Sequence, residues 1–320
     1  MHQRPSRSNW PYCDSTYPDA FSGEKDSCGV GFIANIEGKQ NNWVLSQALR
    51  GLNCMEHRGG CGGDGDSGDG AGILCEIPWS YLKKVWNTAE QCDPKSSGIG
   101  MIFMPRDAKN REKAKNICEQ EAESLGLTSR GWRNVPVNEE VLGKLARENE
   151  PFISQWIVNV KDKENNLEAL LFRLRQRISN RANIELNDDK LGLYICSLSS
   201  KTIVYKGMVR SEILAPFYKD LTDNRFEVSY AVYHRRFSTN TLPKWPLAQP
   251  MRLLGHNGEI NTLLGNINWA KATETDISSV WEDKANDLKP IVNNIFSDSA
   301  NLDLTLELLV RSGRPITDSL

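Results

Sequence analysis

Cys28 stands at the boundary between two stretches of very different composition. Residues 1–27 are polar and show neither helical nor strand periodicity, whereas 29–36 (GVGFIANI) is a short apolar run typical of a buried strand. Cleavage at this boundary would give the Cys28 thiol its own α-amine as a neighbour. That amine, with a pKa of about 8, can accept the thiol proton and later deliver it to a leaving group. Cys28 is therefore a candidate nucleophile with its own general base, and the alternative is an inert buried cysteine.

Three later segments carry side chains suited to holding an amino acid. In 233–241 (YHRRFSTNT) two arginines end a predicted strand, which suits a bidentate grip on a carboxylate. In 255–261 (GHNGEIN) an Asn-Gly pair follows an apolar run, and a side-chain amide beside an unhindered backbone N–H suits an oxyanion hole. In 297–303 (SDSANLD) Asp298 opens a helix predicted over 300–310, either as its N-cap or as a group that grips an ammonium ion.

The glycine-rich segment 59–72 (GGCGGDGDSGDGAG) fits neither of two familiar ligand-binding loops. A phosphate-binding loop needs a Lys and a Ser or Thr after its glycines, whereas the aspartates of this segment would repel phosphate. An EF-hand loop beginning at Asp64 would need Gly at its sixth position, where Asp69 stands. We interpret the segment as a shaped backbone turn beside a site.

Four residues within a short stretch are candidates for a zinc site: Cys54, His57, Cys61 and Cys75. Their spacing matches no common C-x-x-C pair, and Cys54 lies on the apolar face of a predicted helix, where a buried thiol is ordinary. We favour structural cysteines and predict no metal site.

The elements that must position these residues are mostly strands, with helices between groups of strands. Helical spacing covers 42–56, another helix begins at 79, and two more are predicted over 106–125 and 164–182. Strands are predicted at 98–104, 154–159, 193–198, 202–206, 228–237 and 251–256. Because the strands mostly follow one another, this order favours an α+β fold with antiparallel sheet.

Composition excludes several classes of partner. Lys and Arg number 39 against 41 Asp and Glu, a formal net charge of −2, so there is no basic field to attract nucleic acid. No stretch approaches the roughly 18 consecutive apolar residues that span a bilayer, so we predict no membrane partner. The 8 cysteines are scattered through 320 residues, which favours free thiols over a disulfide framework. Four acidic residues within 1–27 favour a propeptide over a transit peptide.

The order of five motifs resembles the class II glutamine amidotransferases, which are N-terminal-nucleophile hydrolases. These motifs are CGVGF at 28–32, MEHRGG at 55–60, HRRFST at 234–239, GHNGEIN at 255–261 and SDSANLD at 297–303. Within that family the chain looks most like the glutaminase domain of glutamate synthases of the ferredoxin-dependent type, through CMEHRGGCGGDGDSGDGAG, GWRNVPVN, IVYKGMVRSE, KWPLAQPMR and LGHNGEINT. The resemblance implies a four-layer αββα sandwich of two antiparallel sheets over 28–320. It also implies a propeptide at 1–27 and a domain truncated at its C-terminal end.

The resemblance also implies roles for individual residues. Cys28, freed at its α-amine, attacks the side-chain amide carbon of L-glutamine. The Asn257 side chain and the Gly258 backbone N–H bind the oxyanion that forms. Arg236 binds the α-carboxylate and Asp298 the α-ammonium group.

Two further residues, Arg58 and Thr239, are assigned to substrate binding on the same resemblance, whereas Arg235 and His256 are interpreted as structural. No cofactor is expected in this chain, but FMN and an iron–sulfur cluster are expected in the full-length enzyme. The partners implied are L-glutamine, downstream synthase domains that use the ammonia for amination of 2-oxoglutarate, and ferredoxin. The location implied is the plastid stroma or the cyanobacterial cytoplasm.

Several alternatives remain open from the sequence. The chain is either an active glutaminase or an inactive fragment that serves as a folding or interaction module. The amidotransferase domain of another class II enzyme is a further possibility, and so is a pyridine nucleotide in place of ferredoxin as electron donor.

Overall fold

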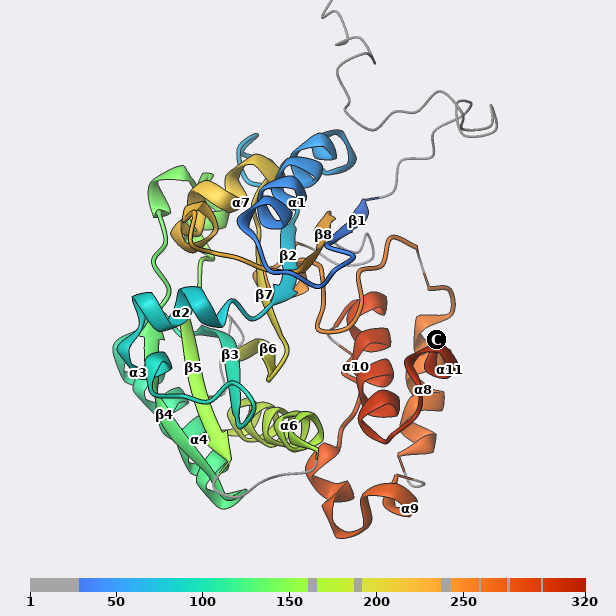
Figure 1. Cartoon of the computed structure of the whole chain (residues 1–320). Coiled ribbons are helices and arrows are strands. Elements are labelled where there is room, and N and C mark those ends of the chain that lie inside the picture. Colours follow the sequence, from blue (N-terminus) through green and yellow to red (C-terminus); the bar gives the residue numbers. More distant parts are fainter. Residues whose placement is uncertain are drawn as a thin grey trace, which may run out of the picture.

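The computed structural model describes residues 29–160, 166–186, 192–236, 243–258, 260–274, 277–294 and 296–320. Within these residues, two antiparallel sheets of four strands each form the centre of the fold (Figure 1). The first sheet has the strand order β1-β8-β2-β7. Its strands are β1 (Val30–Ala34), β8 (Tyr230–Arg235), β2 (Ala71–Glu76) and β7 (Thr202–Gly207).

The second sheet has the strand order β4-β5-β3-β6. Its two interior strands carry long apolar runs because both of their faces are covered. The strands are β4 (Leu127–Asn134), β5 (Phe152–Val160), β3 (Ser97–Met104) and β6 (Tyr194–Ser199).

The two sheets pack face to face over a shared hydrophobic core. Ile73 of β2, Met101 and Phe103 of β3, and Ile157 of β5 belong to one buried cluster that joins the sheets. Helices α1 (Asn42–Cys54) and α7 (Ser211–Phe217) cover the first sheet, and α4 (Ala108–Ser124) and α6 (Leu167–Glu185) cover the second (Figure 1). The predicted α+β fold with two antiparallel sheets between helical layers is therefore confirmed.

The covering helix α1 shows why these sequences become helices. The Asn41 side chain accepts a hydrogen bond from Val44 N and so caps the first turn. Val44, Ala48 and Leu52 recur at helical spacing and are fully buried against the first sheet.

The remaining helices lie around this sandwich. Helices α8, α10 and α11 form a group beside it, with the C-terminus next to α11 (Figure 1). None of the helices described has the length and apolar character needed to cross a membrane. The α-helices in question are α2 (Trp79–Val85), α3 (Asn87–Glu90), α5 (Lys144–Glu148), α8 (Leu263–Thr273), α9 (Ser278–Trp281), α10 (Asp298–Arg311) and α11 (Ile316–Ser319). The 3-10 helices are η3 (Glu56–Arg58), η4 (Glu139–Val141), η5 (Lys219–Thr222), η6 (Trp245–Leu247) and η7 (Glu282–Leu288).

Three details of the predicted elements are wrong. The segment 251–256 is not a strand, because side chains from other elements, and not a neighbouring strand, bind much of its backbone. A strand was missed at Leu127–Asn134, where a bulge between Ser129 and Gly131 and several polar residues weaken the period-2 pattern. Helix α10 has Ser297 as its N-cap, so Asp298 is the first helical residue and not the cap.

Candidate functional site

The described part of the chain begins at Gly29, beside the end of the interior strand β8. Arg235 N of β8 donates a hydrogen bond to Gly29 O at 2.7 Å, and Val30 is then paired with His234. A Cβ at position 29 would lie 2.6 Å from the Arg235 carbonyl oxygen, so only glycine fits there without displacement of the strand. The predicted nucleophile Cys28 lies outside the described residues.

The predicted oxyanion corner, Asn257 and Gly258, lies against this same glycine. A Cβ at position 29 would come within 2.8 Å of Asn257 Oδ1. Both residues of the corner are exposed to solvent. The structure therefore brings the Asn-Gly pair to the residue that follows Cys28 in the sequence, although more than 200 residues separate them along the chain.

Contacts from three other parts of the chain hold His256, the residue that precedes Asn257. His256 N donates to Gln249 Oε1 at 2.9 Å, and His256 O lies 2.9 Å from His234 Nε2 of β8. The His256 ring contacts α10, with 3.3 Å between its Nδ1 and Ser299 Oγ. The position of the corner is thus set by long-range side-chain contacts.

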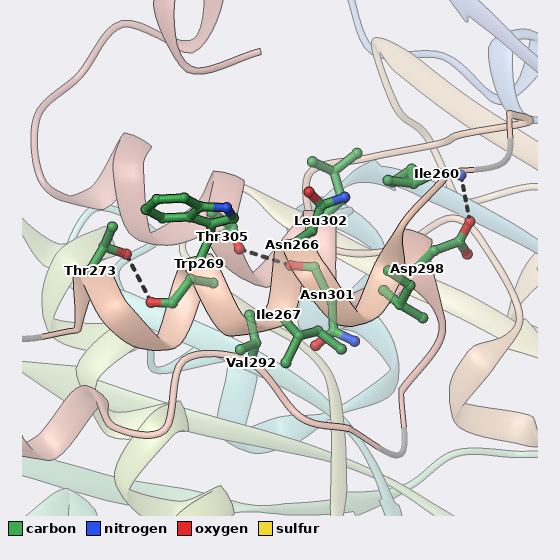
Figure 2. A pocket seen from close by; sticks show the side chains of 12 residues that line it. Ile260, Asn266, Ile267, Trp269, Thr273, Val292, Asp298, Asn301, Leu302 and Thr305 are labelled. Atoms are coloured by element: carbon green, nitrogen blue, oxygen red, sulfur yellow. Dashed lines mark hydrogen bonds between the residues drawn. The ribbon is translucent and has the colours of Figure 1, made fainter.

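Asp298 connects the N-terminus of α10 to the segment that follows the corner. Its Oδ2 accepts a hydrogen bond from Ile260 N at 2.9 Å (Figure 2), and its Oδ1 accepts from Ser299 N at 2.7 Å. The residue is almost completely buried, and an acidic group in the first turn of a helix is favoured by the helix dipole. Asp298 is therefore hydrogen-bonded to the residue two positions after Gly258.

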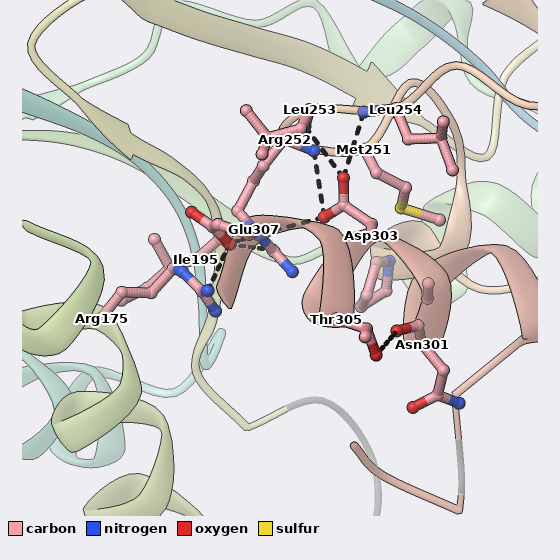
Figure 3. Close-up of polar contacts among 12 residues, drawn as sticks. Arg175, Ile195, Met251, Arg252, Leu253, Leu254, Asn301, Asp303, Thr305 and Glu307 are labelled. Atoms are coloured by element: carbon pink, nitrogen blue, oxygen red, sulfur yellow. Dashed lines mark hydrogen bonds and ion pairs between the residues drawn. The ribbon is translucent and has the colours of Figure 1, made fainter. Parts of the chain in front are cut away.

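A buried ionic network fixes the segment that leads into the corner (Figure 3). Asp303 Oδ1 of α10 accepts hydrogen bonds from Leu253 N at 2.9 Å and Leu254 N at 3.1 Å. Arg252 Nε lies 3.1 Å from Glu307 Oε2, and Glu307 also binds Arg175 of α6. Burial opposes ionisation of Glu307, but the two guanidinium groups hold its pKa below the ordinary value. The network joins α10, α6 and the segment 252–254 into one unit.

Arg236 is the first residue after β8 and directly follows Arg235, whose backbone N binds Gly29 O. Its backbone N donates to Gly70 O at 2.8 Å, and its φ is +99°, a region that non-glycine residues rarely adopt. Such a conformation costs on the order of 1–3 kcal/mol and is typical of functional sites. The Arg236 side chain is exposed.

Arg235, by contrast, is buried and anchors the end of β8. Its guanidinium forms ion pairs with Asp69 and with Glu56, the latter at 3.1 Å, and donates to Gly70 O at 3.0 Å. Burial by itself would raise the pKa of Glu56, but hydrogen bonds from Ser211 and Arg235 hold it below its ordinary value. Arg235 is therefore part of the framework, as the sequence interpretation had it.

Two predicted site residues remain, Arg58 and Thr239, and only Arg58 lies among the described residues. Arg58 ends the short helix η3, half-buried, in the turn whose Glu56 and Gly59 pack on Arg235. Thr239 lies outside the described residues. Among the residues that are described, no three His, Cys, Asp or Glu side chains are grouped so that they could hold a metal ion.

A cavity of about 280 Å³ lies between α8 and α10, with Asp298 and Ile260 at one end (Figure 2). Its walls are mostly apolar, and Trp269 of α8 stands at its edge with 74% of its surface exposed. The residues that line it include no Lys or Arg, so the cavity itself offers no cation for the carboxylate of an amino acid.

The supporting residues of the corner were not found from the sequence. His234, Gln249 and Ser299 act through single contacts with a backbone or a ring located 7 to 43 residues away. Burial lowers the pKa of His234 to about 4, so its ring is neutral at neutral pH. In the sequence, His234 lies between Tyr233 and two arginines. Neither the periodicity nor the spacing of these residues distinguishes it from an ordinary core histidine.

Comparisons of the sequence with known proteins identify the family of the chain. The sequence model of the class-II glutamine amidotransferases matches residues 28–320. Ferredoxin-dependent glutamate synthase 2 of Synechocystis sp. is 51% identical over 297 residues, which cover 91% of this chain and 19% of that protein. The Pyropia yezoensis ferredoxin-dependent glutamate synthase is 49% identical over 303 residues, or 93% of this chain and 19% of that protein.

A chloroplastic ferredoxin-dependent glutamate synthase of Spinacia oleracea is 46% identical over 303 residues, covering 93% of this chain and 18% of that protein. The chain thus spans about a fifth of the length of the curated relatives it matches. Because the family match runs from residue 28 through residue 320, the chain belongs to the class-II glutamine amidotransferases.

Proposed function

We propose that residues 28–320 form the glutaminase part of a glutamate synthase, with Cys28 as an N-terminal nucleophile exposed by removal of residues 1–27. The observation that carries the proposal is the contact between Gly29 and Asn257. Residue 28 is covalently bonded to Gly29, and consecutive Cα atoms are about 3.8 Å apart. A substrate bound to residue 28 therefore meets the Asn-Gly corner.

In the proposed reaction, the Cys28 thiol gives its proton to its own α-amine as the sulfur attacks the side-chain amide carbon of L-glutamine. The Asn257 side-chain amide and the Gly258 N–H stabilise the oxyanion. The carbon–nitrogen bond then breaks, and the α-ammonium returns its proton to the leaving nitrogen, which departs as ammonia. Water hydrolyses the γ-glutamyl thioester, which releases glutamate and restores the thiol.

Arg236 and Asp298 are proposed to select an α-amino acid. The exposed guanidinium of Arg236 is available for the α-carboxylate, and Asp298 lies beside the corner where an α-ammonium would be held. Arg58 and Thr239 belong to the same substrate site in this proposal.

For the whole enzyme we propose that the ammonia aminates 2-oxoglutarate in other domains, with ferredoxin as electron donor. The names of the Synechocystis and Pyropia relatives support this assignment. We propose that FMN and an iron–sulfur cluster likewise belong to those other domains. A chloroplastic relative and a cyanobacterial one support the plastid stroma or the cyanobacterial cytoplasm as the location.

The test is mass spectrometry of the expressed chain after treatment with a diazoketone analogue of L-glutamine. We expect a species that begins at Cys28 and carries one label, together with release of ammonia from L-glutamine. Cys28→Ala should abolish labelling and turnover. Cys61→Ala, which removes another exposed thiol, is the matched control and should change neither.

An intact leader without labelling would contradict the proposal and favour the inactive folding or interaction module. Asn257→Ala should lower kcat by about 10²–10³-fold while the chain still becomes labelled, because one oxyanion donor is lost. Turnover that is unaffected by this substitution would exclude the corner from the site.

A further inference from the structure

His234 of strand β8 forms a hydrogen bond with the backbone next to the Asn257–Gly258 corner. The residue lies in the interior strand β8, paired with Val30 of β1 and with Gly72 of β2, and only 1% of its surface is exposed. Its Nε2 points out of the sheet to His256 O at 2.9 Å. That carbonyl belongs to the peptide directly before Asn257.

We propose that His234 is a positioning residue that holds the Asn257–Gly258 corner in the orientation needed to bind an oxyanion. This inference rests on the proposed glutaminase function. An oxyanion hole acts through donors that are aimed before the reaction begins, so a group that fixes the orientation of the peptide plane influences the rate without touching substrate.

The tautomer of His234 follows from its partner. A carbonyl oxygen can only accept, so Nε2 must carry the ring proton. The other ring nitrogen, Nδ1, is buried and makes no contact of full hydrogen-bond geometry among the described residues, although the nearby Arg236 backbone favours a proton on the ring. The neutral ring thus has one donor, and that donor is directed at the corner.

The contact is part of a two-sided restraint on one residue. Gln249 Oε1 accepts from His256 N at 2.9 Å, whereas His234 binds His256 O, so both peptides that flank His256 are held. Gln249 belongs to the segment before the corner, but His234 belongs to the sheet. His234 therefore supplies a hydrogen bond that ties the corner to the sheet that contains β1.

Two substitutions separate this role from a merely structural one. In His234→Gln the side-chain amide nitrogen can reach the position of Nε2, which preserves a donor to His256 O. In His234→Asn the same amide group is one methylene shorter and reaches only the position of Nδ1. The two variants have the same chemistry and similar polarity, so each serves as the control for the other.

The experiment measures ammonia release from L-glutamine by the full chain that begins at Cys28, with thermal unfolding followed in parallel. We expect His234→Asn to lose about 10- to 100-fold in kcat with KM within twofold of the wild type, a smaller loss than removal of an oxyanion donor. His234→Gln should retain at least a third of the wild-type kcat. Equal losses in the two variants, an unchanged kcat in His234→Asn, or an effect on KM alone would overturn the inference.

Hydrogen exchange supplies a readout that does not depend on turnover. Peptides that cover residues 255–258 should exchange faster in His234→Asn than in the wild type, and His234→Gln should restore the protection. Unchanged exchange in His234→Asn would refute the positioning role. A wild-type chain that begins at Cys28, shows the protected corner and yet releases no ammonia would refute the glutaminase function and leave the positioning of the corner intact.

Discussion

Replacement of Arg235 by Met tests how the end of β8 is anchored. The guanidinium is fully buried and contacts Asp69, Glu56 and Gly70 O, so its removal leaves two carboxylates without their cation. Loss of one member of a buried ion pair costs about 3–5 kcal/mol. At roughly 2–4 °C per kcal/mol for a domain of this size, Tm should fall by about 6–20 °C.

The assay is thermal unfolding followed by circular dichroism at neutral pH. Arg225→Met is the matched control, because Arg225 pairs with Asp223 at the surface with about half of its side chain exposed, and it should leave Tm unchanged. Asp69→Asn added to Arg235→Met should recover part of the loss, since it removes one uncompensated charge. A Tm for Arg235→Met that equals the control, or a double variant with no recovery, would refute this account of the anchor.

Two further predictions concern the same turn and a separate buried carboxyl group. Gly59→Ala should lower the free energy of unfolding by about 1–3 kcal/mol, because the added Cβ would meet Arg235 Cζ at 1.8 Å. Gly63→Ala in the same glycine-rich stretch is the control, because its Cβ would meet nothing within 4 Å, and it should leave the free energy of unfolding unchanged. Urea unfolding measures both. Glu150→Gln should raise Tm at pH 8 more than at pH 5. Burial, with Glu139 nearby, raises the pKa of Glu150 to about 7. The wild type therefore loses stability as the pH rises from about 4.5 through 7, whereas the glutamine variant does not. Equal gains in Tm at both pH values would show that ionisation of Glu150 does not affect stability.

The layers of the fold could be predicted because their sequences carry strong local signals. The apolar residues of α1 recur at helical spacing, and the interior strand β3 is continuously apolar. The failures occur where the backbone is bound by something other than its own neighbours. The segment 251–256 has the composition of a strand, but Asp303 and Gln249 satisfy much of its backbone.

Candidate residues of the site could be named from the sequence, whereas the residues that support them could not. The Asn-Gly pair and Asp298 were identified from their residue types and from the family resemblance, and the structure joins them through Ile260. No local pattern links His234 to His256 or Asp303 to Leu253, because such contacts depend on how β8 and α10 are packed. The roles assigned to all of the site residues stay predictions, and Cys28 and Thr239 also lie outside the described residues.

The pairing of β1 with β8 makes sheet register a requirement for catalysis in the proposed site. Strand β1 is an edge strand with five residues matched to β8, and that match also sets the position of Gly29, whose carbonyl accepts from Arg235 N. A shift of two residues would keep every side chain on its own face but displace Gly29 by about 6.8 Å, more than the length of a hydrogen bond. A molecule with this shift could be folded and yet inactive in the proposed reaction. In the proposed site, the register of the edge strand thus sets the distance between the nucleophile and the oxyanion hole.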